Sequence, residues 1–187
     1  MRAVTFSMSM SLDGFIVGPD GSFDFPGFDE EIFRISFDEV RLVDVHLMGR
    51  KLYETMLYWE DPARSPDFDE SEREWAELWN PLPKVVFSRT LTEVKGNARL
   101  ATGGVAEEIA RLRAEPGGGE IAIGGADIAA QAADAGLIDE YKIRVFPVLV
   151  GGGIPFFSRN EQRVELELLE SRTFSSKVLY LHYRVVR

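Results

Sequence analysis

The stretch that decides the fold is residues 120–135, which read EIAIGGADIAAQAADA. The apolar run from Glu120 to Ile123 predicts a buried strand, and it leads directly into Gly124 and Gly125. The small side chains from Asp127 to Ala135 then predict a helix that lies close to a sheet or to a ligand. A helix that starts at the end of a strand exposes unpaired backbone N–H groups and the positive end of its dipole, so this junction is a candidate anion site.

Two further loop signals stand where strands are expected to end. They are Gly49-Arg50-Lys51 and Ser88-Arg89-Thr90, and Gly124-Gly125-Ala126 is the third signal of the set. Arg and Lys supply the charge that a phosphate needs, so together the three predict a cradle for a phosphorylated dinucleotide. Each has a plain alternative when taken alone: a tight strand-to-helix turn at the glycines, surface charges at a helix start, and a simple loop at residues 88–90.

The rest of the chain alternates strand and helix signals. We expect strands at residues 3–11, 43–48, 84–88, 99–101 and 141–146, and helices at 28–42, 50–58, within 70–78 and around 105–112. Residues 164–168 and 179–185 alternate with period two around a turn at Ser175-Ser176, so they predict an antiparallel hairpin.

This order predicts an α/β fold of one domain spanning residues 1–187. Repeated strand–helix–strand units followed by a hairpin indicate a mixed, mainly parallel sheet with helices on both faces and an antiparallel C-terminal hairpin. Ligands of such sheets bind beyond the carboxyl ends of the strands, where the three loop signals are expected.

Composition narrows the classes of function. The chain has 187 residues with 45% apolar content, and it has no cysteine, which excludes disulfides and thiolate metal sites. Its two histidines, His46 and His182, lie in strand patterns, so we expect no metal site. The net charge of −10 argues against nucleic acid or an anionic membrane as a partner. No signal-peptide pattern or membrane-spanning run is seen, so we expect a cytoplasmic protein.

Four segments, in order, resemble a known superfamily. They are SLDG at residues 11–14, MGRK at 48–51, IGGA at 123–126 and PVLVGGGIPFF at 147–157. The set is similar to the dihydrofolate reductase-like superfamily, and more narrowly to the reductase (C-terminal) domain of the bifunctional riboflavin-biosynthesis deaminase/reductase and its stand-alone relatives. The resemblance implies the three-layer dihydrofolate reductase-like fold and an NADPH-dependent reductase.

The resemblance also implies roles for the loop residues. Gly49, Arg50 and Lys51 would hold the phosphates of NADPH, and Ser88, Arg89 and Thr90 would receive its adenosine 2′-phosphate. The segment Gly124-Gly125-Ala126 would let the backbone approach the pyrophosphate, and related reductases often have a cis peptide between the two glycines.

On the substrate side, Asp13 is the candidate catalytic residue, and Ile16 in the same loop would pack on the nicotinamide. Asp13-Gly14 is also a common turn pair, so a structural Asp13 stays an alternative.

Three positions depart from the family patterns. Phe33 stands near the place of the carboxylate that holds the pterin in dihydrofolate reductases, unless Asp29 or Glu30 replaces it. Ile123 stands where riboflavin-pathway reductases commonly have a glutamate, and Leu52 replaces a threonine. Dihydrofolate itself is therefore an unexpected substrate.

We expect a reductase of a small planar heterocycle that is pyrimidine- or pteridine-like. One alternative is the riboflavin-pathway enzyme, 5-amino-6-(5-phosphoribosylamino)uracil reductase, and another is a non-catalytic nucleotide-binding protein. A set of aromatic residues is expected either to line an apolar pocket or to form core: Phe23, Phe25, Phe28, Phe33, Tyr58 and Trp59. The apolar segment from Pro147 to Phe157 either packs against a second subunit, giving a homodimer, or folds back on its own domain.

Overall fold

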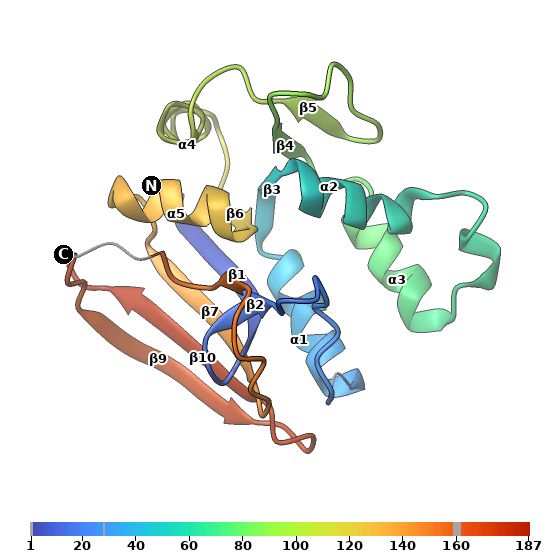
Figure 1. Cartoon of the computed structure of the whole chain (residues 1–187). Coiled ribbons are helices and arrows are strands. Elements are labelled where there is room, and N and C mark those ends of the chain that lie inside the picture. Colours follow the sequence, from blue (N-terminus) through green and yellow to red (C-terminus); the bar gives the residue numbers. More distant parts are fainter. Residues whose placement is uncertain (1, 28, 159–161) are drawn as a thin grey trace.

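An eight-stranded sheet forms the centre of the computed structural model, which describes residues 2–27, 29–158 and 162–187 (Figure 1). The order of strands across the sheet is β5-β4-β3-β6-β1-β7-β10-β9. These strands are β1 (Val4–Ser11), β3 (Val43–Gly49), β4 (Lys84–Phe87), β5 (Ala98–Leu100), β6 (Glu120–Gly124), β7 (Glu140–Phe146), β9 (Leu166–Thr173) and β10 (Leu179–Val185).

The strands from β5 to β7 pair in parallel, whereas β10 runs antiparallel between β7 and β9. The predicted mixed, mainly parallel sheet with a C-terminal antiparallel hairpin is therefore confirmed. A small antiparallel sheet of β2 (Phe15–Val17) and β8 (Ile154–Pro155) was not predicted. Its strands of three and two residues are too short to show a period-two pattern.

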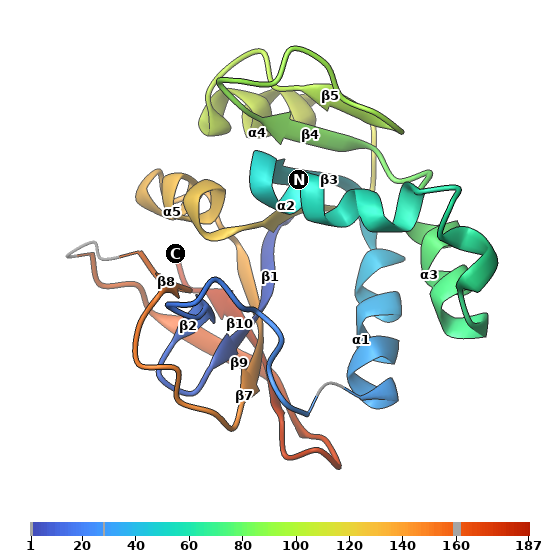
Figure 2. The same cartoon turned by 45° about the vertical axis from the view of Figure 1, so that its right-hand side comes forward.

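Five α-helices surround the sheet within the described residues (Figure 2). They are α1 (Glu30–Val40), α2 (Arg50–Met56), α3 (Glu70–Trp79), α4 (Val105–Ala114) and α5 (Ala126–Asp134). None of the helices described is long and apolar enough to cross a membrane.

The helices cover both faces of the sheet, as predicted. One core packs α4 and α5 against the sheet side that carries Val45 and Leu47 of β3. A second core packs α1, α2 and α3 against the opposite side, to which Met48 of β3 belongs. This division follows from the pleat of the strand, because successive side chains point to opposite faces.

Helix boundaries differ from the sequence expectation by a few residues. The helix expected at 28–42 begins after Asp29, whose carboxylate accepts a hydrogen bond from the Ile32 amide at 3.0 Å. The helix expected at 50–58 ends at Met56 and continues as a 3₁₀ turn, Leu57–Glu60. Phe28 lies outside the described residues.

Candidate functional site

The structure brings the three loop signals together at the carboxyl edge of the sheet, the edge at which the parallel strands end. Strands β4, β3 and β6 are neighbours, with Gly49 opposite Phe87 and Met48 opposite Gly124. The turn at Ser88, the start of α2 and the start of α5 therefore follow adjacent strand ends (Figure 1). Their common edge is the usual ligand side of an open α/β sheet.

The starts of α2 and α5 differ from those of α1 and α3. Their N-cap residues are Gly49 and Gly125, and neither has a side chain that accepts from the first turn. In contrast, the Asp29 carboxylate caps the first turn of α1 and the Asp69 carboxylate that of α3. At α4, the Glu107 carboxylate accepts only from the amide of Gly104, the N-cap residue itself. Within the described part of the chain, α2, α4 and α5 are therefore the α-helices whose first-turn N–H groups have no side-chain acceptor, and of these α2 and α5 follow the neighbouring strands β3 and β6.

The cations near these helix starts form few contacts with other groups of the described chain. Arg50 is exposed and lies 3.6 Å from Glu54, also exposed, as an i,i+4 pair. No hydrogen bond or ion pair involves the side chains of Lys51 or Arg89 in the described ranges, and both residues are exposed. Their charges are available to a ligand.

The hydroxyl of Ser88 has a local task. Its Oγ accepts from the amides of Thr90 at 3.2 Å and Leu91 at 3.0 Å, which fixes the turn after β4. This turn presents Arg89 and Thr90 to solvent beside the start of α2.

The two glycines after β6 have different constraints. Gly125 has φ +91° and open space where a side chain would stand, so its backbone is accessible. Gly124 is buried, and a Cβ there would overlap Leu52 Cδ2 and lie 2.7 Å from His46 Cε1. Of the pair, only Gly125 faces open space. No cis peptide occurs among the described residues, so the cis bond seen in related reductases is not found between them.

Asp13 holds two segments of chain together. Its carboxylate accepts from Ser11 Oγ at 2.6 Å, the Gly151 amide at 2.7 Å and the Val150 amide at 3.2 Å. The Ser11 hydrogen bond, followed by those of the two amides, holds the pKa of Asp13 below its ordinary value. Asp13 is therefore a carboxylate acceptor at neutral pH rather than an acid, and its catalytic role stays a prediction.

Comparison with known proteins decides the family. The family model described as the RibD C-terminal domain matches residues 2–180. The chain belongs to the RibD C-terminal domain family. It is 31% identical over 182 residues to the uncharacterized protein YyaP of Bacillus subtilis (strain 168), covering 97% of this chain and 94% of YyaP. It is 29% identical over 183 residues to the uncharacterized protein YwjB of the same strain, covering 97% of each.

Solved structures give the RibD-type fold. A "putative riboflavin biosynthesis protein" from Shewanella sp. PV-4 superposes with a TM-score of 0.77 at 27% identity over the full length of both chains. The deaminase/5-amino-6-(5-phosphoribosylamino)uracil reductase of Thermotoga maritima superposes with a TM-score of 0.68 at 14% identity, covering 99% of this chain and 57% of that one. The predicted dihydrofolate reductase-like fold is thereby confirmed.

Positions that depart from the dihydrofolate reductase or riboflavin-reductase patterns are buried or engaged. Ile123 is fully buried in the core on the α4 and α5 side, so no polar group replaces the expected glutamate. On α1, Phe33 packs on Phe37 and Trp75, with ring centroids 4.9 and 5.7 Å apart. Glu30 pairs with Arg34 at the surface, and the neighbouring Asp29 is the N-cap of this helix.

The aromatic residues expected in a pocket or in the core are partly buried and partly exposed. Phe25 is buried against Phe146, and Trp59 joins Phe33 in the core beneath α1 and α3. Tyr58 is 38% exposed and contacts Trp59 from outside that core. The expectation that these residues form core is confirmed for Phe25, Phe33 and Trp59. It is wrong for Phe23, which is 61% exposed, and for Tyr58. Ile16, the residue expected against a nicotinamide, is only 5% exposed, so its contact with a ligand stays a prediction.

Sequence reasoning missed the position of His46. It lies in β3 as predicted, but its ring packs against Gly124, where it would clash with any added side chain. Its Nδ1 is buried without a hydrogen-bond partner in the described part of the chain. Burial, and then the charge of Lys84, lower the pKa of His46 to about 4, so the ring is neutral at pH 7. No signal in the sequence reveals this, because the contact depends on β3 and β6 being neighbours.

Proposed function

We propose that this RibD-type chain is an NADPH-dependent reductase that transfers hydride to a small planar heterocycle. The observation that carries the proposal is the pair of adjacent helix starts without side-chain caps, at Arg50 and Ala126, beside the cation Arg89, which has no partner among the described residues. A dinucleotide with three phosphates needs this combination of free N–H groups and free positive charge.

Each part of the edge has a role in holding the cofactor. The first-turn amides of α5, reached past the open Gly125, bind the pyrophosphate together with Gly49, Arg50 and Lys51 at the start of α2. Arg89 and Thr90 bind the 2′-phosphate, and the chain prefers NADPH to NADH for that reason. When bound, NADPH supplies hydride from the nicotinamide.

The protein's task in hydride transfer is to orient the substrate and exclude water. Asp13, fixed by Ser11 and the Gly151 amide, keeps the β1–β2 loop and residues 148–151 in one position. Its carboxylate still has acceptor capacity for an N–H or O–H of a heterocycle, since a carboxylate accepts up to about four hydrogen bonds.

The riboflavin-pathway reaction is the second candidate. The 27% identity to the Shewanella protein over both whole chains supports it. The buried Ile123 in place of a glutamate speaks against the same pyrimidine substrate. A binding protein without turnover is the third candidate, and only an activity measurement separates it from the reductases.

Titration of the purified protein with NADPH and NADH, by calorimetry or by tryptophan quenching, tests cofactor binding. We expect tight NADPH binding, weaker NADH binding, and a 10- to 100-fold loss of NADPH affinity in Arg50→Ala, which is what one charge-assisted contact provides at about 1.5–3 kcal/mol. Arg34→Ala is the matched control, because Arg34 forms a similar exposed i,i+4 pair with Glu30 on α1. Equal affinity in wild type and Arg50→Ala contradicts the proposed site.

Oxidation of NADPH in the presence of pyrimidine and pteridine candidates tests turnover. A reductase consumes NADPH with one class of heterocycle and loses rate in Asp13→Asn with little change in cofactor affinity. Binding of NADPH without consumption by any of these compounds supports the binding-protein alternative.

A further inference from the structure

The two halves of the candidate site have opposite charge. The cofactor half, formed by residues 48–54 and 88–92, has the three cations Arg50, Lys51 and Arg89 against one acid, Glu54. The substrate half includes residues 11–31, which run from the end of β1 to the first turn of α1. This stretch has no lysine or arginine, and it has six acids: Asp13, Asp20, Asp24, Asp29, Glu30 and Glu31.

The fold brings both halves to the carboxyl edge of the sheet but keeps them apart. Helix α1 leads back to the amino edge, where β3 begins, so its first turn lies toward the carboxyl edge. The stretch before it is held there because the Leu12 amide donates to the Val148 carbonyl at 2.9 Å and Asp13 accepts from the Gly151 amide. In Figures 1 and 2, β2 and the start of α1 both lie below α2. A ligand that spans the two halves therefore meets positive charge at one end and negative charge at the other.

The buried cations beside the substrate half are already paired. Arg144 of β7 is 6% exposed, and its guanidinium pairs with Glu39 of α1 at 2.5 Å and donates to Ser7 Oγ at 3.1 Å. Lys142, two residues earlier in β7, pairs with Glu120 at 2.8 Å. These charges stabilise the contact between α1 and the sheet, and neither is free for an anionic ligand.

Exposed cations near the substrate half are outnumbered by acids. Arg34 pairs with Glu30 one turn along α1. Lys177 is exposed and has no ion pair within the described ranges, but it lies in the β9–β10 turn two residues after Ser175, whose hydroxyl donates to Glu31 at 2.5 Å. Residues 147–157, which adjoin the β1–β2 loop, contain no charged side chain. A phosphate on this side would meet more carboxylates than unpaired cations.

The face of β1 that points to α1 carries uncharged polar groups. A central parallel strand is usually apolar on both faces, but here Thr5, Ser7, Ser9 and Ser11 alternate along one of them. The Ser7 hydroxyl donates to Glu39 at 2.7 Å, which shows that this face lies toward α1. Ser9 is half-buried, and its hydroxyl has no partner among the described residues. It can donate to or accept from a neutral polar group of a ligand.

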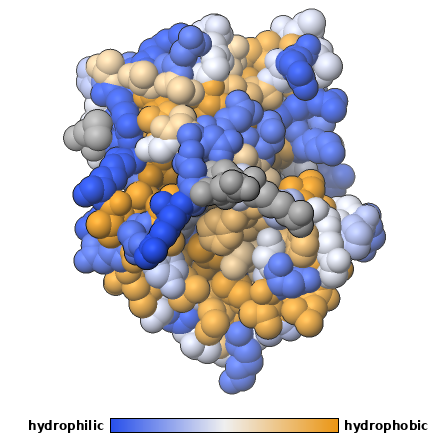
Figure 3. Space-filling model, turned by 60° about the vertical axis from the view of Figure 1, so that its left-hand side comes forward, coloured by the Kyte–Doolittle hydropathy of each residue, from blue (hydrophilic) through white to orange (hydrophobic). Residues whose placement is uncertain are grey.

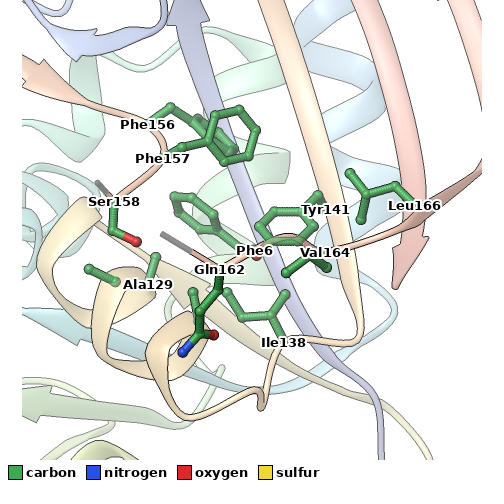
Figure 4. A pocket seen from close by; sticks show the side chains of 12 residues that line it. Phe6, Ala129, Ile138, Tyr141, Phe156, Phe157, Ser158, Gln162, Val164 and Leu166 are labelled. Carbon is green, nitrogen blue, oxygen red and sulfur yellow. The ribbon is translucent and has the colours of Figure 1, made fainter. Parts of the chain in front are cut away.

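The opposite face of β1 is apolar and offers no charge. A hollow of about 280 Å³ lies on that side, and α5, β7 and residues 156–166 contribute to its described lining (Figures 3 and 4). Phe156 packs there on Phe6, with ring centroids 4.4 Å apart, so this part of the segment from Pro147 to Phe157 folds back on its own domain. The described lining has no charged side chain. On either face of β1, the described residues therefore present no free cation.

We propose that the substrate is an uncharged or cationic heterocycle that has no phosphate or carboxylate group. This inference rests on the proposed reductase function and narrows its substrate by charge. An anion in the substrate half is repelled by the six acids and finds no unpaired cation at β1, whereas a neutral ring can use the Ser9 hydroxyl and the Asp13 carboxylate. The phosphoribosylamino group in the name of the Thermotoga maritima enzyme would bring a phosphate to this side, so we expect a different substrate here.

Titration with two pairs of probes tests the proposal, because each pair shares a ring system and differs by one acidic group. The pairs are pterin with 6-carboxypterin, and uridine with uridine monophosphate, at pH 7 and low ionic strength, with and without NADPH. We expect the uncharged member of a pair to bind about tenfold more tightly than the anionic member. An anionic member that binds as tightly as its uncharged partner, or the absence of binding by both uncharged members, overturns the proposal.

Reversal of one charge tests whether the acids cause the preference. Asp24 is exposed, and its carboxylate has no partner in the described part of the chain, so Asp24→Lys changes the charge without removing a contact. We expect it to narrow the difference in affinity within a pair by about threefold at low salt, and added salt should narrow the difference in wild type. Glu77→Lys is the matched control, since it makes the same change of charge on the exposed side of α3. No effect of Asp24→Lys, or an equal effect of Glu77→Lys, contradicts the proposal.

The same titrations separate this inference from the proposed reaction. Absence of NADPH binding to wild type would contradict the proposed cofactor site. The preference between the members of a pair is also measured without NADPH, so it can fail while cofactor binding is intact and can hold where cofactor binding fails.

Discussion

The two edges of the sheet use the same residue types in opposite ways. At the amino edge, where the parallel strands begin, Arg2 is 8% exposed, donates to the Leu112 carbonyl at 2.9 Å and pairs with Asp44 at 3.3 Å. Lys84 is 2% exposed and donates to the carbonyls of Trp79 and Leu82. At the carboxyl edge, the side chains of Lys51 and Arg89 are exposed and engage no group of the described chain.

The size of a hollow does not indicate which edge can bind a ligand. The amino edge has a hollow of about 440 Å³, and its lining includes Arg2, Asp44, Lys84 and Arg99. Each of these charges already has a partner in the protein. A ligand there would have to compete with existing ion pairs, whereas a ligand at the carboxyl edge meets free donors.

Replacing one cation at each edge should separate effects on the free energy of unfolding from effects on NADPH affinity. Lys84 pairs with Glu60 at 3.2 Å, and the Glu60 side chain is only 12% exposed. Lys84→Met leaves that carboxylate and several carbonyls without a partner, so we expect the free energy of unfolding to fall by about 3–5 kcal/mol. Arg50→Ala should change it by less than about 0.5 kcal/mol.

Urea denaturation of both variants, alongside NADPH titration, makes this measurement. The comparison breaks down if Arg50→Ala is the more destabilised protein, or if folded Lys84→Met loses NADPH affinity as Arg50→Ala does.

A buried carboxylate near the start of α4 should affect stability in acid. Glu108 in α4 is fully buried, and burial raises its pKa, but hydrogen bonds from Arg99 and the Thr102 amide lower it to about 2. Because the folded pKa is depressed, the stabilisation is complete above the unfolded value of 4.5 and is lost as pH falls toward 2, by about 3 kcal/mol.

Stability measured from pH 7 to pH 2.5 checks this, in wild type and in Glu108→Gln. The variant should be less stable at pH 7 and lose less stability across the window. Glu77→Gln, on the exposed side of α3, is the control. An unchanged acid profile in Glu108→Gln would show that this carboxylate does not set it.

Gly124 at the α5 junction should not tolerate a methyl group. Gly124→Ala forces overlap with Leu52 and His46, so we expect about 1–3 kcal/mol of destabilisation, relieved in part by adding Leu52→Ala. Gly118→Ala is the control, because a Cβ there meets nothing within 4 Å and its φ is not positive. Thermal melts of Gly124→Ala, of Gly124→Ala with Leu52→Ala and of Gly118→Ala measure the effect. An unchanged melting temperature for Gly124→Ala would rule out the tight contact.

The smallest expected effect concerns cofactor choice. Arg89→Ala removes an exposed charge with no partner in the described residues, so stability should stay within about 0.5 kcal/mol. The preference for NADPH over NADH should fall about tenfold, equivalent to about 1.4 kcal/mol, with NADH affinity nearly unchanged. A parallel loss of both affinities would assign Arg89 to the pyrophosphate rather than the 2′-phosphate.

Much of the fold was predictable because its signals are local. The run from Glu120 to Ala135 contains a strand, a glycine junction and a helix within one short stretch, and the structure has β6 and α5 there. The final hairpin was equally visible from its period-two pattern. The strands β2 and β8 were missed because their pairing joins residues that are distant in the chain.

The candidate site was predictable only as a set of loops. That the loops after β3, β4 and β6 meet follows from the strand order, which the sequence suggests through its strand–helix–strand units. The opposing constraints on Gly124 and Gly125 were not predictable, because one depends on Leu52 and His46 from another strand and helix. Two of the three hydrogen bonds of Asp13 likewise depend on a loop more than 130 residues away.

Amide spectra recorded during NADPH titration test the central claim most directly, since they report which edge the cofactor touches. We expect the amides of residues 50–53, 88–91 and 126–128 to shift and saturate together, while those of Arg2, Lys84 and Gly117 at the amino edge stay unchanged. The absence of shifts at the carboxyl edge, or larger shifts at the amino edge, would contradict the assignment of the site.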